Sequence, residues 1–305
     1  MTYIKKARFG GIKKGRVAGF KTDLFGGPTC GNCGNRPRVG RLVGRGGVSP
    51  GHLPTIGNKQ TTGRLMSIGD IRALTFDTGG TILDWHSGFS GAFAAAGKRH
   101  GIDKAWPAIT NELRRRSLKA MLNLGEHEPP AYNFDGAHRF TVEALVKEHG
   151  LDAFTEDDIH AIAYEAPHNF RCWPDFPAVL PELRKSFSVA SFTILSYRLI
   201  IDTAKKNGLS WDAVFSCEGI GKYKLLPEAY RTVAQYLQLD VGQCCMVACH
   251  NFDLDAAKAV GFKTAFVRRP GEWGAEGPPD PEPNPVHDII VDDFPGLAKA
   301  LGVDV

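Results

Sequence analysis

Asp77 is a carboxylate at the point where an apolar run of the chain gives way to a Gly-Gly turn. Residues 71–76 have the length and composition of a buried strand, and open α/β folds build their sites at the carboxyl ends of such strands. Gly79 and Gly80 allow a tight turn that brings backbone N–H groups close to a ligand. The Thr81 hydroxyl can reach the same point. Such a carboxylate can be a nucleophile that forms a covalent ester with substrate, or it can cap the turn.

Three further polar residues follow later apolar runs. Thr193 ends one run, Lys224 lies in the loop after the next, and Asp253 follows a third. If each run is a strand of one parallel sheet, these side chains converge on Asp77. A lysine there would keep Asp77 ionised, because an opposite charge within about 4–6 Å favours the charged form. The plainer alternatives are a strand residue for Thr193, a solvated loop lysine for Lys224 and a helix N-cap for Asp253.

Short apolar runs alternate with helical segments from residue 68 onward, which predicts an α/β fold with a doubly wound parallel sheet. The runs and periodicities predict strands at 72–77, 188–193, 213–216, 245–248, 264–267 and 288–291. Helices are predicted at 199–207, 227–237, 253–260 and 294–301.

The first two predicted strands are separated by about 110 residues, which is far too long for a single crossover. Helical periodicity fills this interval at 89–100, 106–122, 136–149 and 156–164. We therefore expect a helical cap at residues 88–181 inserted into a core formed by 68–87 and 182–305. A cap at this place would cover the sheet edge that carries Asp77 and exclude water from it.

Residues 1–65 differ in composition from the rest of the chain. They contain 13 Lys and Arg, one acid and 15 glycines, so they carry +12, and the remaining residues carry −8 to give +4 overall. A basic, Gly-rich segment with few large apolar residues cannot bury a core, which predicts disorder. The segment could bind nucleic acid, but we favour a start assigned too far upstream of Met66. Cys30 and Cys33 are half of a zinc-ribbon pattern without a second pair nearby.

The composition is that of an ordinary globular protein, with 43% hydrophobic and 23% charged residues. We find no run of the length of a membrane span and no apolar signal-peptide core near the beginning. The seven cysteines lack the regular spacing of a disulfide framework. We therefore expect a cytoplasmic protein.

From residue 71 onward the sequence resembles the haloacid dehalogenase superfamily. Residues 76–81, Phe-Asp-Thr-Gly-Gly-Thr, are similar to its first motif, and Thr193, Lys224 and Asp253 are similar to the central residues of the next three. The resemblance implies a Rossmann-like core with an inserted cap and Asp77 as the nucleophile.

Within the superfamily, the chain is most similar to the type II, or L-2-haloacid, dehalogenase group. Residues 83–87, Leu-Asp-Trp-His-Ser, resemble the stretch after the nucleophile turn of that group. Lys224 and Tyr230 match its Tyr-Lys…Tyr spacing.

Residues 113–121 resemble the cap helix that carries the halide-binding arginine of this group. Three consecutive arginines on a helix usually form a solvated face, yet one guanidinium directed inward suits an anion. The spacing to Met121 selects Arg114, and Arg115 is the alternative register.

Two departures from the superfamily bear on the reaction. Its phosphatases bind Mg²⁺ through the nucleophile, a backbone carbonyl and acids of the fourth motif, and use a second Asp two residues after the nucleophile as general acid. Here that position is Gly79, and Cys249 replaces the first acid of the fourth motif. A thiol suits Mg²⁺ poorly, whereas halide departure needs neither a proton nor a metal. Phosphoryl transfer is therefore disfavoured, and we expect no metal or other cofactor.

Three further departures concern the shape and polarity of the pocket. Ile194 and His250 stand where the dehalogenase group usually has Asn, and Ala248 stands where it has Ser. The pocket should therefore differ from that of a typical member.

The resemblance implies a metal-independent mechanism. Asp77 would displace halide from a short 2-haloalkanoic acid, and the aspartyl ester would then be hydrolysed to the 2-hydroxy acid. Arg114 would stabilise the departing halide, and Lys224 would keep Asp77 ionised. Asp253 with His250 would position the hydrolytic water. The other substrate-binding positions that it implies are Thr81, Thr193, Ile194 and Tyr230.

Two other interpretations stay open: a Mg²⁺-dependent phosphonatase or phosphatase on the same scaffold, or a non-catalytic scaffold whose basic residues 1–65 bind a partner. For the dehalogenase, the expected partner is a small halogenated carboxylic acid, with no nucleic acid and no membrane. The resemblance also implies a homodimer.

Overall fold

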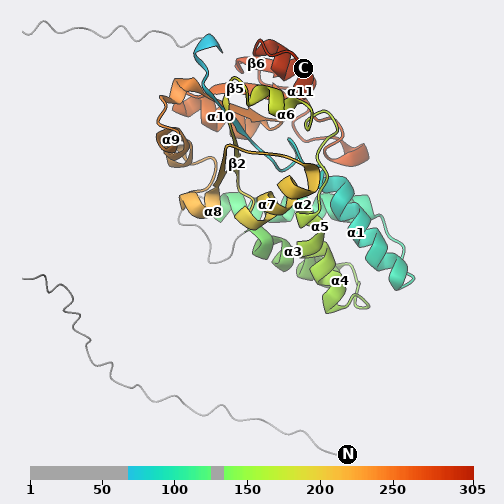
Figure 1. The fold of residues 1–305 in the computed structure, drawn as a ribbon. Coiled ribbons are helices and arrows are strands. Elements are labelled where there is room, and N and C mark those ends of the chain that lie inside the picture. The colour runs from blue at the N-terminus through green and yellow to red at the C-terminus, as the bar shows by residue number, and fades with distance from the viewer. Residues whose placement is uncertain (1–67, 125–133) are drawn as a thin grey trace, which may run out of the picture. The chain divides into compact units, whose positions relative to one another are not determined.

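The computed structural model of this chain describes residues 68–124 and 134–305 (Figure 1). The predictions for residues 1–65, including those for Cys30 and Cys33, lie outside the described residues. Among the helices of the described part, none is both long and apolar enough to cross a membrane.

The core is a six-stranded sheet in the order β3-β2-β1-β4-β5-β6, and every neighbouring pair is parallel. This confirms the predicted α/β class, and the strand order is that of a Rossmann-like sheet. The four central strands, β2, β1, β4 and β5, are completely or largely buried, as parallel strands covered on both faces must be, whereas the edge strands β3 and β6 are more exposed. The strands are Ala73–Phe76, Ser188–Thr193, Ala213–Ser216, Cys244–Ala248, Lys263–Val267 and Ile289–Val291.

The strand bounds differ from the predicted ones by at most one residue at each end. The difference that matters is at β1, which ends at Phe76 and leaves Asp77 in the loop rather than in the strand. The backbone N–H of Asp77 still donates to the carbonyl of Val247, at 2.9 Å. This bond ties the start of the loop to β4.

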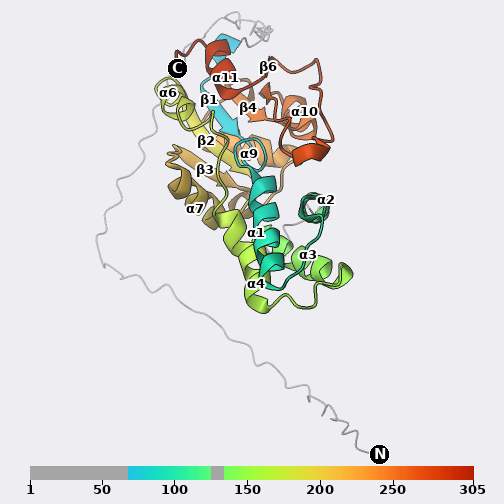
Figure 2. The ribbon, with the colours of Figure 1, turned by 90° about the vertical axis from the view of Figure 1, so that its right-hand side faces the viewer.

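Helices cover both faces of the sheet (Figures 1 and 2). On one face, α6 (Val179–Leu183) and α11 (Phe294–Ala300) pack together, and the Phe76 ring of β1 contacts Phe176 and Phe294. On the other face, α9 (Pro227–Tyr236) packs on α10 (Asn251–Val260). There Phe192 of β2 contacts Tyr230. This two-sided cover explains why the strands read as continuous apolar runs.

Between β1 and β2 the chain is mostly helical, as predicted. The helix α1 begins at Trp85, four residues before the predicted start, because the Asp84 side chain accepts a bond from the Ser87 N–H and caps the helix there. The predicted helix 156–164 is interrupted by a π-helical turn and continues beyond it. The elements are α1 (Trp85–Arg99), α2 (Trp106–Leu124), α3 (Phe134–Glu148), α4 (Glu156–His160), the π-helical turn (Ala161–Glu165) and α5 (Ala166–His168).

The remaining elements connect the strands of the core. Gly208 follows α7 in the left-handed conformation, and Gly261 follows α10 in the same way; glycine tolerates this conformation without steric strain. The elements are α7 (Tyr197–Asn207), α8 (Cys217–Ile220) and the 3-10 helices Ile68–Asp70, Val241–Gln243 and Gly274–Glu276.

His168 joins helices that are far apart in the sequence. Its Nδ1 lies 2.8 Å from Asp202 Oδ2 of α7, and its Nε2 lies 3.3 Å from Asp135 Oδ1 of α3. The Ser196 hydroxyl donates to the other Asp135 oxygen, at 2.6 Å. Burial by itself would lower the pKa of His168, but the two carboxylates outweigh it and raise the pKa above its ordinary value. When it is protonated, the ring therefore links α3, α5 and α7 through two ion pairs.

Replacing His168 with Gln should destabilise the fold more at about pH 6 than at about pH 9. The pKa of His168 is higher in the folded chain, so its stabilisation is complete below the unfolded pKa of about 6.5 and is lost as the pH rises through the folded value. We expect a loss of about 2 kcal/mol at the lower pH, measured by urea unfolding. The control is His160→Gln, whose side chain is half exposed. An equal loss at both pH values would contradict the charged link.

Candidate active site

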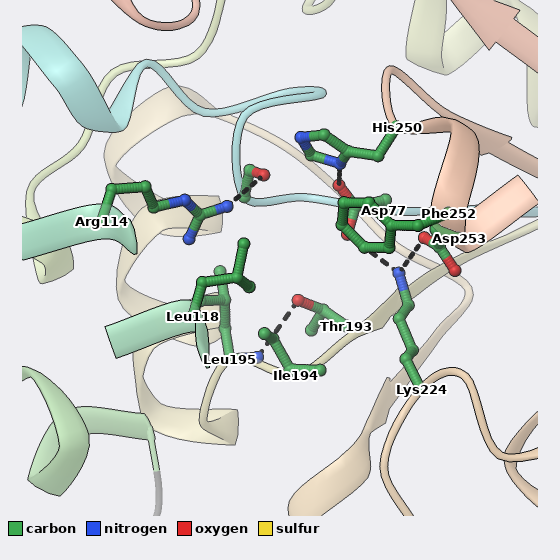
Figure 3. A pocket seen from close by; sticks show the side chains of 11 residues that line it. Asp77, Arg114, Leu118, Thr193, Ile194, Leu195, Lys224, His250, Phe252 and Asp253 are labelled. Atoms are coloured by element: carbon green, nitrogen blue, oxygen red, sulfur yellow. Dashed lines mark hydrogen bonds and ion pairs between the residues drawn. The ribbon is translucent and has the colours of Figure 1, made fainter. Parts of the chain in front are cut away.

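The four sequence elements predicted to carry chemistry meet at one edge of the sheet (Figure 3). Asp77 follows β1, and Thr193 is the last residue of β2. Lys224 lies in the loop between α8 and α9, after β3. His250 follows β4, and Asp253 lies in the first turn of α10. They converge because all four strands are parallel and present their carboxyl ends at the same edge.

Both oxygens of the Asp77 carboxylate are held. Lys224 Nζ donates to Oδ1 at 2.8 Å, and the Thr81 hydroxyl donates to Oδ2 at 2.7 Å. His250 Nδ1 lies 3.4 Å from the same Oδ2. Burial by itself would raise the pKa of Asp77, but the charge of Lys224 and then the contacts with His250 outweigh it and lower the pKa below its ordinary value. Asp77 is therefore an ionised, positioned carboxylate at neutral pH.

Lys224 links Asp77 to Asp253. Its Nζ also donates to Asp253 Oδ2, at 2.7 Å, and the hydroxyl of Tyr230 donates to Asp253 Oδ1, at 2.7 Å. Burial by itself would lower the pKa of Lys224, but Asp253 and Asp77 raise it above its ordinary value. Both oxygens of Asp253 are thus engaged, which leaves this carboxylate suited to holding Lys224 in place.

Two of the predicted substrate-binding residues do not line the pocket. Tyr230 lies behind it and holds Asp253, and Thr81 holds Asp77 from the side of the loop. Thr193 and Ile194 do line the pocket. The Thr193 oxygen accepts bonds from the Thr78 hydroxyl at 2.8 Å and from the Leu195 N–H at 3.2 Å, and these bonds fix the turn after β2.

Arg114 enters the pocket from α2. The buried stripe of this helix includes Leu113, Ser117 and Met121, and Arg114 lies on it with 6% of its surface exposed. Its Nη2 donates to the Gly79 carbonyl at 3.1 Å, and its guanidinium lies 5.2 Å from the centre of the Trp85 ring.

The Arg114 guanidinium is not neutralised by a paired carboxylate. Its Nε has no hydrogen-bond partner, and within residues 68–124 and 134–305 no acidic side chain forms an ion pair with it. Arg115, the alternative register, instead forms an ion pair with Glu276 and stays half exposed. A buried cation without an ion-pair partner is suited to binding an anion.

The pocket between these residues is small. Its volume is about 20 Å³, which is room for about one water molecule. Leu118, Leu195 and Phe252 supply apolar walls beside the charged groups. A ligand larger than a water molecule would therefore require this pocket to widen.

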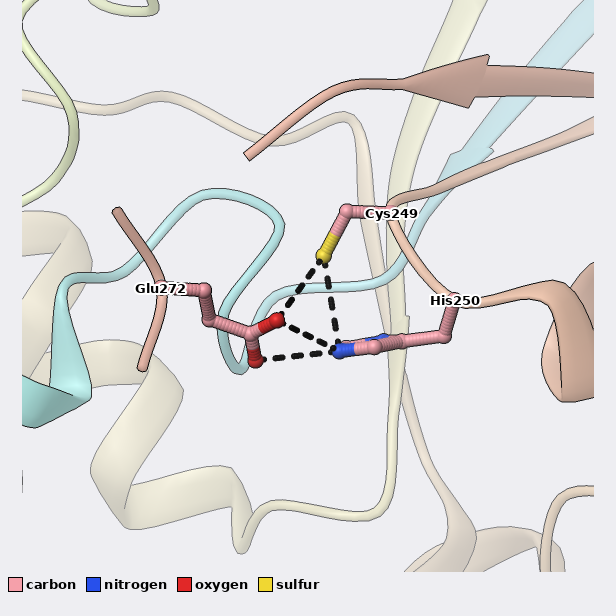
Figure 4. A group of neighbouring side chains, drawn as sticks. All are labelled: Cys249, His250 and Glu272. Carbon is pink, nitrogen blue, oxygen red and sulfur yellow. Dashed lines mark hydrogen bonds and ion pairs between the residues drawn. The ribbon is translucent and has the colours of Figure 1, made fainter. Parts of the chain in front are cut away.

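Glu272 is a residue of the site that the sequence did not reveal (Figure 4). It is 1% exposed and follows β5 in a Pro-Gly loop. Its carboxylate lies 3.0 Å from His250 Nε2, accepts a bond from Trp85 Nε1 at 2.9 Å and lies 3.6 Å from Cys249 Sγ. The one signal in the sequence was an acidic residue shortly after a predicted buried strand, and this signal alone does not identify a site residue.

The residues present do not fit Mg²⁺. A hard cation needs several free oxygen ligands, whereas Asp77 and Asp253 already bind cationic and hydroxyl donors, and Cys249 stands where another acid would be required. The Gly79 carbonyl is occupied by Arg114.

The cluster of Cys249, His250 and Glu272 brings its donor atoms within 4.8 Å of one another. Metal binding would require a thiolate and a neutral imidazole. Burial raises the pKa of the Cys249 thiol, and the pKa of His250 is also raised. The three side chains instead hydrogen-bond to one another and form a hydrogen-bonded cluster.

Replacing Lys224 with Met should destabilise the fold by about 3–5 kcal/mol, because two buried carboxylates lose their shared cation. The loss should shrink as the pH falls, since protonation then neutralises the carboxylates. Denaturant unfolding at several pH values measures both effects. Lys205→Met, at an exposed position of α7, is the control and should change stability little. A loss that does not depend on pH would contradict an electrostatic cause.

Comparison with known proteins places the chain in a family. Residues 71–261 match the family model for haloacid dehalogenase-like hydrolases. A crystal structure of a defluorinating L-2-haloacid dehalogenase is 31% identical with a TM-score of 0.71, and covers 76% of this chain and 95% of that one. A second L-2-haloacid dehalogenase is 32% identical with a TM-score of 0.70, and covers 76% and 99%.

A more distant structure supports the fold alone. The L-2-haloacid dehalogenase of Xanthobacter autotrophicus with chloropropionic acid covalently bound is 21% identical, with a TM-score of 0.60 over 76% of this chain and 98% of that one.

The curated relative found is enolase-phosphatase E1 of Xanthobacter autotrophicus, 31% identical over 110 residues. The match covers 34% of this chain and 48% of that protein, so the chain spans about half the length of the curated relative it matches. By the family model that matches most of its length, together with its parallel sheet and the Asp77 site, this chain belongs to the haloacid dehalogenase-like hydrolase family.

Proposed function

We propose that this hydrolase releases halide from short 2-haloalkanoic acids and forms the 2-hydroxy acid through an ester on Asp77. The observation that carries the proposal is the pair formed by ionised Asp77 and the buried Arg114, which has no ion-pair partner, at opposite sides of one small pocket. A nucleophile facing an anion site is the arrangement that halide displacement requires. The structures of two L-2-haloacid dehalogenases more than 30% identical to this chain support the proposal.

In the first half of the reaction, an Asp77 oxygen attacks the carbon that bears the halogen. The new C–O bond forms as the C–X bond breaks, and its electron pair leaves with the halide, with inversion at the carbon. Arg114 stabilises the charge that develops on the halogen. Lys224 keeps Asp77 ionised for the attack.

The substrate carboxylate needs donors of its own. In the proposed complex, Thr193 and the backbone N–H groups of the turn after it hold this carboxylate, with Ile194 against the carbon chain. Thr81 and Tyr230 do not contact the substrate in this complex; Thr81 holds Asp77 in place and Tyr230 holds Asp253. In the second half, water attacks the ester carbonyl of Asp77 and releases the hydroxy acid. Asp253 and His250 border the space where this water must lie.

The choice of a halide over an alcohol as leaving group rests on proton supply. An alkoxide must be protonated as it leaves, and residue 79, where superfamily phosphatases carry their acid, is a glycine packed against the Arg114 guanidinium. Halide leaves as a stable anion and needs the cation instead. Phosphoester or phosphonate hydrolysis is the second candidate, because the curated relative found is a phosphatase by name.

We further propose that residues 88–181 act as a cap on a core made of 68–87 and 182–305. The contact from Arg114 on α2 to Gly79 after β1 spans these two parts. Closure of the cap on bound substrate would bring Arg114 to the halogen and exclude bulk water. The proposed partner is one small haloacid per site.

The full chain should release halide from haloacetates and from one enantiomer of 2-chloropropionate, equally with EDTA and with Mg²⁺. Asp77→Asn should abolish release, because the attacking carboxylate is gone. A single turnover in heavy-oxygen water should place the label in Asp77 and leave the first product unlabelled. Halide titration and mass spectrometry provide the measurements.

Two results would contradict this scheme. Direct labelling of the product with unlabelled Asp77 would exclude the ester. Phosphate release from phosphoesters that requires Mg²⁺, without halide release from any haloacid, would favour the second candidate.

Arg114→Met should lower kcat for the chloro acids by about 10²–10³-fold, since the departing halide loses its cation. Arg115→Met is the matched control on the next residue of the same helix and should stay close to wild type, because Arg115 pairs with Glu276 at the surface. Steady-state halide release measures both. Similar losses in the two variants would show that the arginines act through the stability of α2.

A further inference from the structure

His250 is held between two carboxylates. Its Nδ1 lies 3.4 Å from Asp77 Oδ2, and its Nε2 lies 3.0 Å from Glu272 Oε1. The Phe252 ring stacks on the imidazole with a centroid distance of 5.2 Å, which fixes the plane of the ring. His250 is also the N-cap residue of α10, yet its side chain makes no capping bond. The ring is therefore free to join Asp77 to Glu272.

Glu272 is an unusual neighbour for a histidine at a reacting group. The backbone of Gly80, with φ +97°, leaves the space that the Glu272 carboxylate fills; a Cβ at Gly80 would collide with it. Trp85 Nε1 fixes one oxygen. In the described part of the chain, His250 is the one cationic side chain within ion-pair distance of Glu272. A buried carboxylate is stabilised by a nearby cation, and both ring nitrogens of His250 face carboxylates, which favours the charged imidazole.

We propose that His250, kept cationic by Glu272, stabilises the oxyanion that forms on Asp77 Oδ2 when water attacks the aspartyl ester. The inference rests on the proposed function, because it assigns the second half of that reaction. His250 is then a catalytic residue, since it lies against a reacting atom, and Glu272 is a positioning residue that acts through it. Thr81, which donates to Oδ2 at 2.7 Å, supplies the second donor. Together the two donors form an oxyanion hole.

The step balances as follows. The water oxygen bonds to Cγ of Asp77, and the carbonyl π electrons move to Oδ2, which becomes the oxyanion. The Cγ–O bond to the substrate residue then breaks. One water proton ends on the hydroxyl oxygen of the released acid, and the other goes to solvent as Asp77 returns to its carboxylate. His250 keeps its proton throughout and moves closer to Oδ2 as negative charge builds up there.

The charges around His250 are consistent with this role. Burial by itself would lower the pKa of His250, but Cys249, Glu272 and the contact with Asp77 raise it well above its ordinary value. Burial holds Cys249 as a neutral thiol, so the effective charges are those of Glu272 and Asp77. Lys224 faces Asp77, and Arg114 acts on Glu272 from α2. When Asp77 becomes an ester, its charge is lost, but Glu272 still holds the proton on His250.

A general-base role would require the opposite protonation state. An imidazolium has no free lone pair for a water proton, so a base would have to lose its proton before each hydrolysis. The two roles therefore predict opposite pH dependence when Glu272 is neutralised.

The first experiment separates the two halves of the reaction in full-chain protein. Rapid mixing with excess chloroacetate gives the halide burst, and intact-mass spectrometry of quenched samples gives the ester. In His250→Ala, one equivalent of halide should be released quickly, and the ester should accumulate because its hydrolysis slows about 10²-fold. His250→Asn keeps a neutral donor near the position of Nδ1, so its loss should be smaller. A normal burst with unchanged ester hydrolysis in both variants would overturn the inference alone; a wild-type protein that releases no halide from any haloacid would overturn the proposed function.

The second experiment uses Glu272→Gln, which keeps the shape of the side chain and removes its charge. The His250 proton then becomes easier to lose, so ester hydrolysis should slow as the pH rises from about 5.5 to about 9, while wild type stays flat over the neutral range. Glu276→Gln, an acid of the same loop that pairs with Arg115, is the matched control and should follow wild type. Hydrolysis that slows as the pH falls would identify a general base and overturn the oxyanion role, as would an unchanged profile.

Discussion

The ion pair of Lys224 with Asp77 is the interaction on which the rest of the site depends. A buried carboxylate is expensive to ionise without a partner, and a buried lysine is no easier to charge. Each stabilises the charged form of the other. The same pairing of opposite charges continues from Lys224 to Asp253, and from Asp77 through His250 to Glu272. The site therefore holds three anions and three cations, all of them buried except His250, which is partly buried: Asp77, Asp253, Glu272, Lys224, His250 and Arg114.

Such a balanced set constrains the chemistry that it can perform. In the proposed displacement, negative charge moves from Asp77 to the leaving group, and the group that receives it must lie near a cation that is not already in an ion pair. Arg114 meets that condition, whereas Arg115 does not, because its charge is paired with Glu276 at the surface. The net charge of the pocket then changes little between the reacting state and the ester, which keeps the electrostatic reorganisation small.

Much of this site could be predicted from the sequence, for a physical reason. Asp77, Lys224 and Asp253 follow strands of one parallel sheet, so the topology alone brings them together. The contacts of Glu272 could not be predicted in this way, because it lies in a Pro-Gly loop without periodicity and meets Trp85 across 187 positions of the chain. The position of Tyr230 behind Asp253 was missed for a related reason: spacing identified the residue but not the direction in which its hydroxyl points.

Gly80 has a consequence beyond the geometry of its turn. Any side chain at this position would displace the Glu272 carboxylate, and the imidazole would then lose the anion that keeps its proton. A residue with no titratable group thus sets a protonation state two contacts away. In an activity assay, a substitution of Gly80 would change the optimum pH, although neither an acid nor a base had been altered.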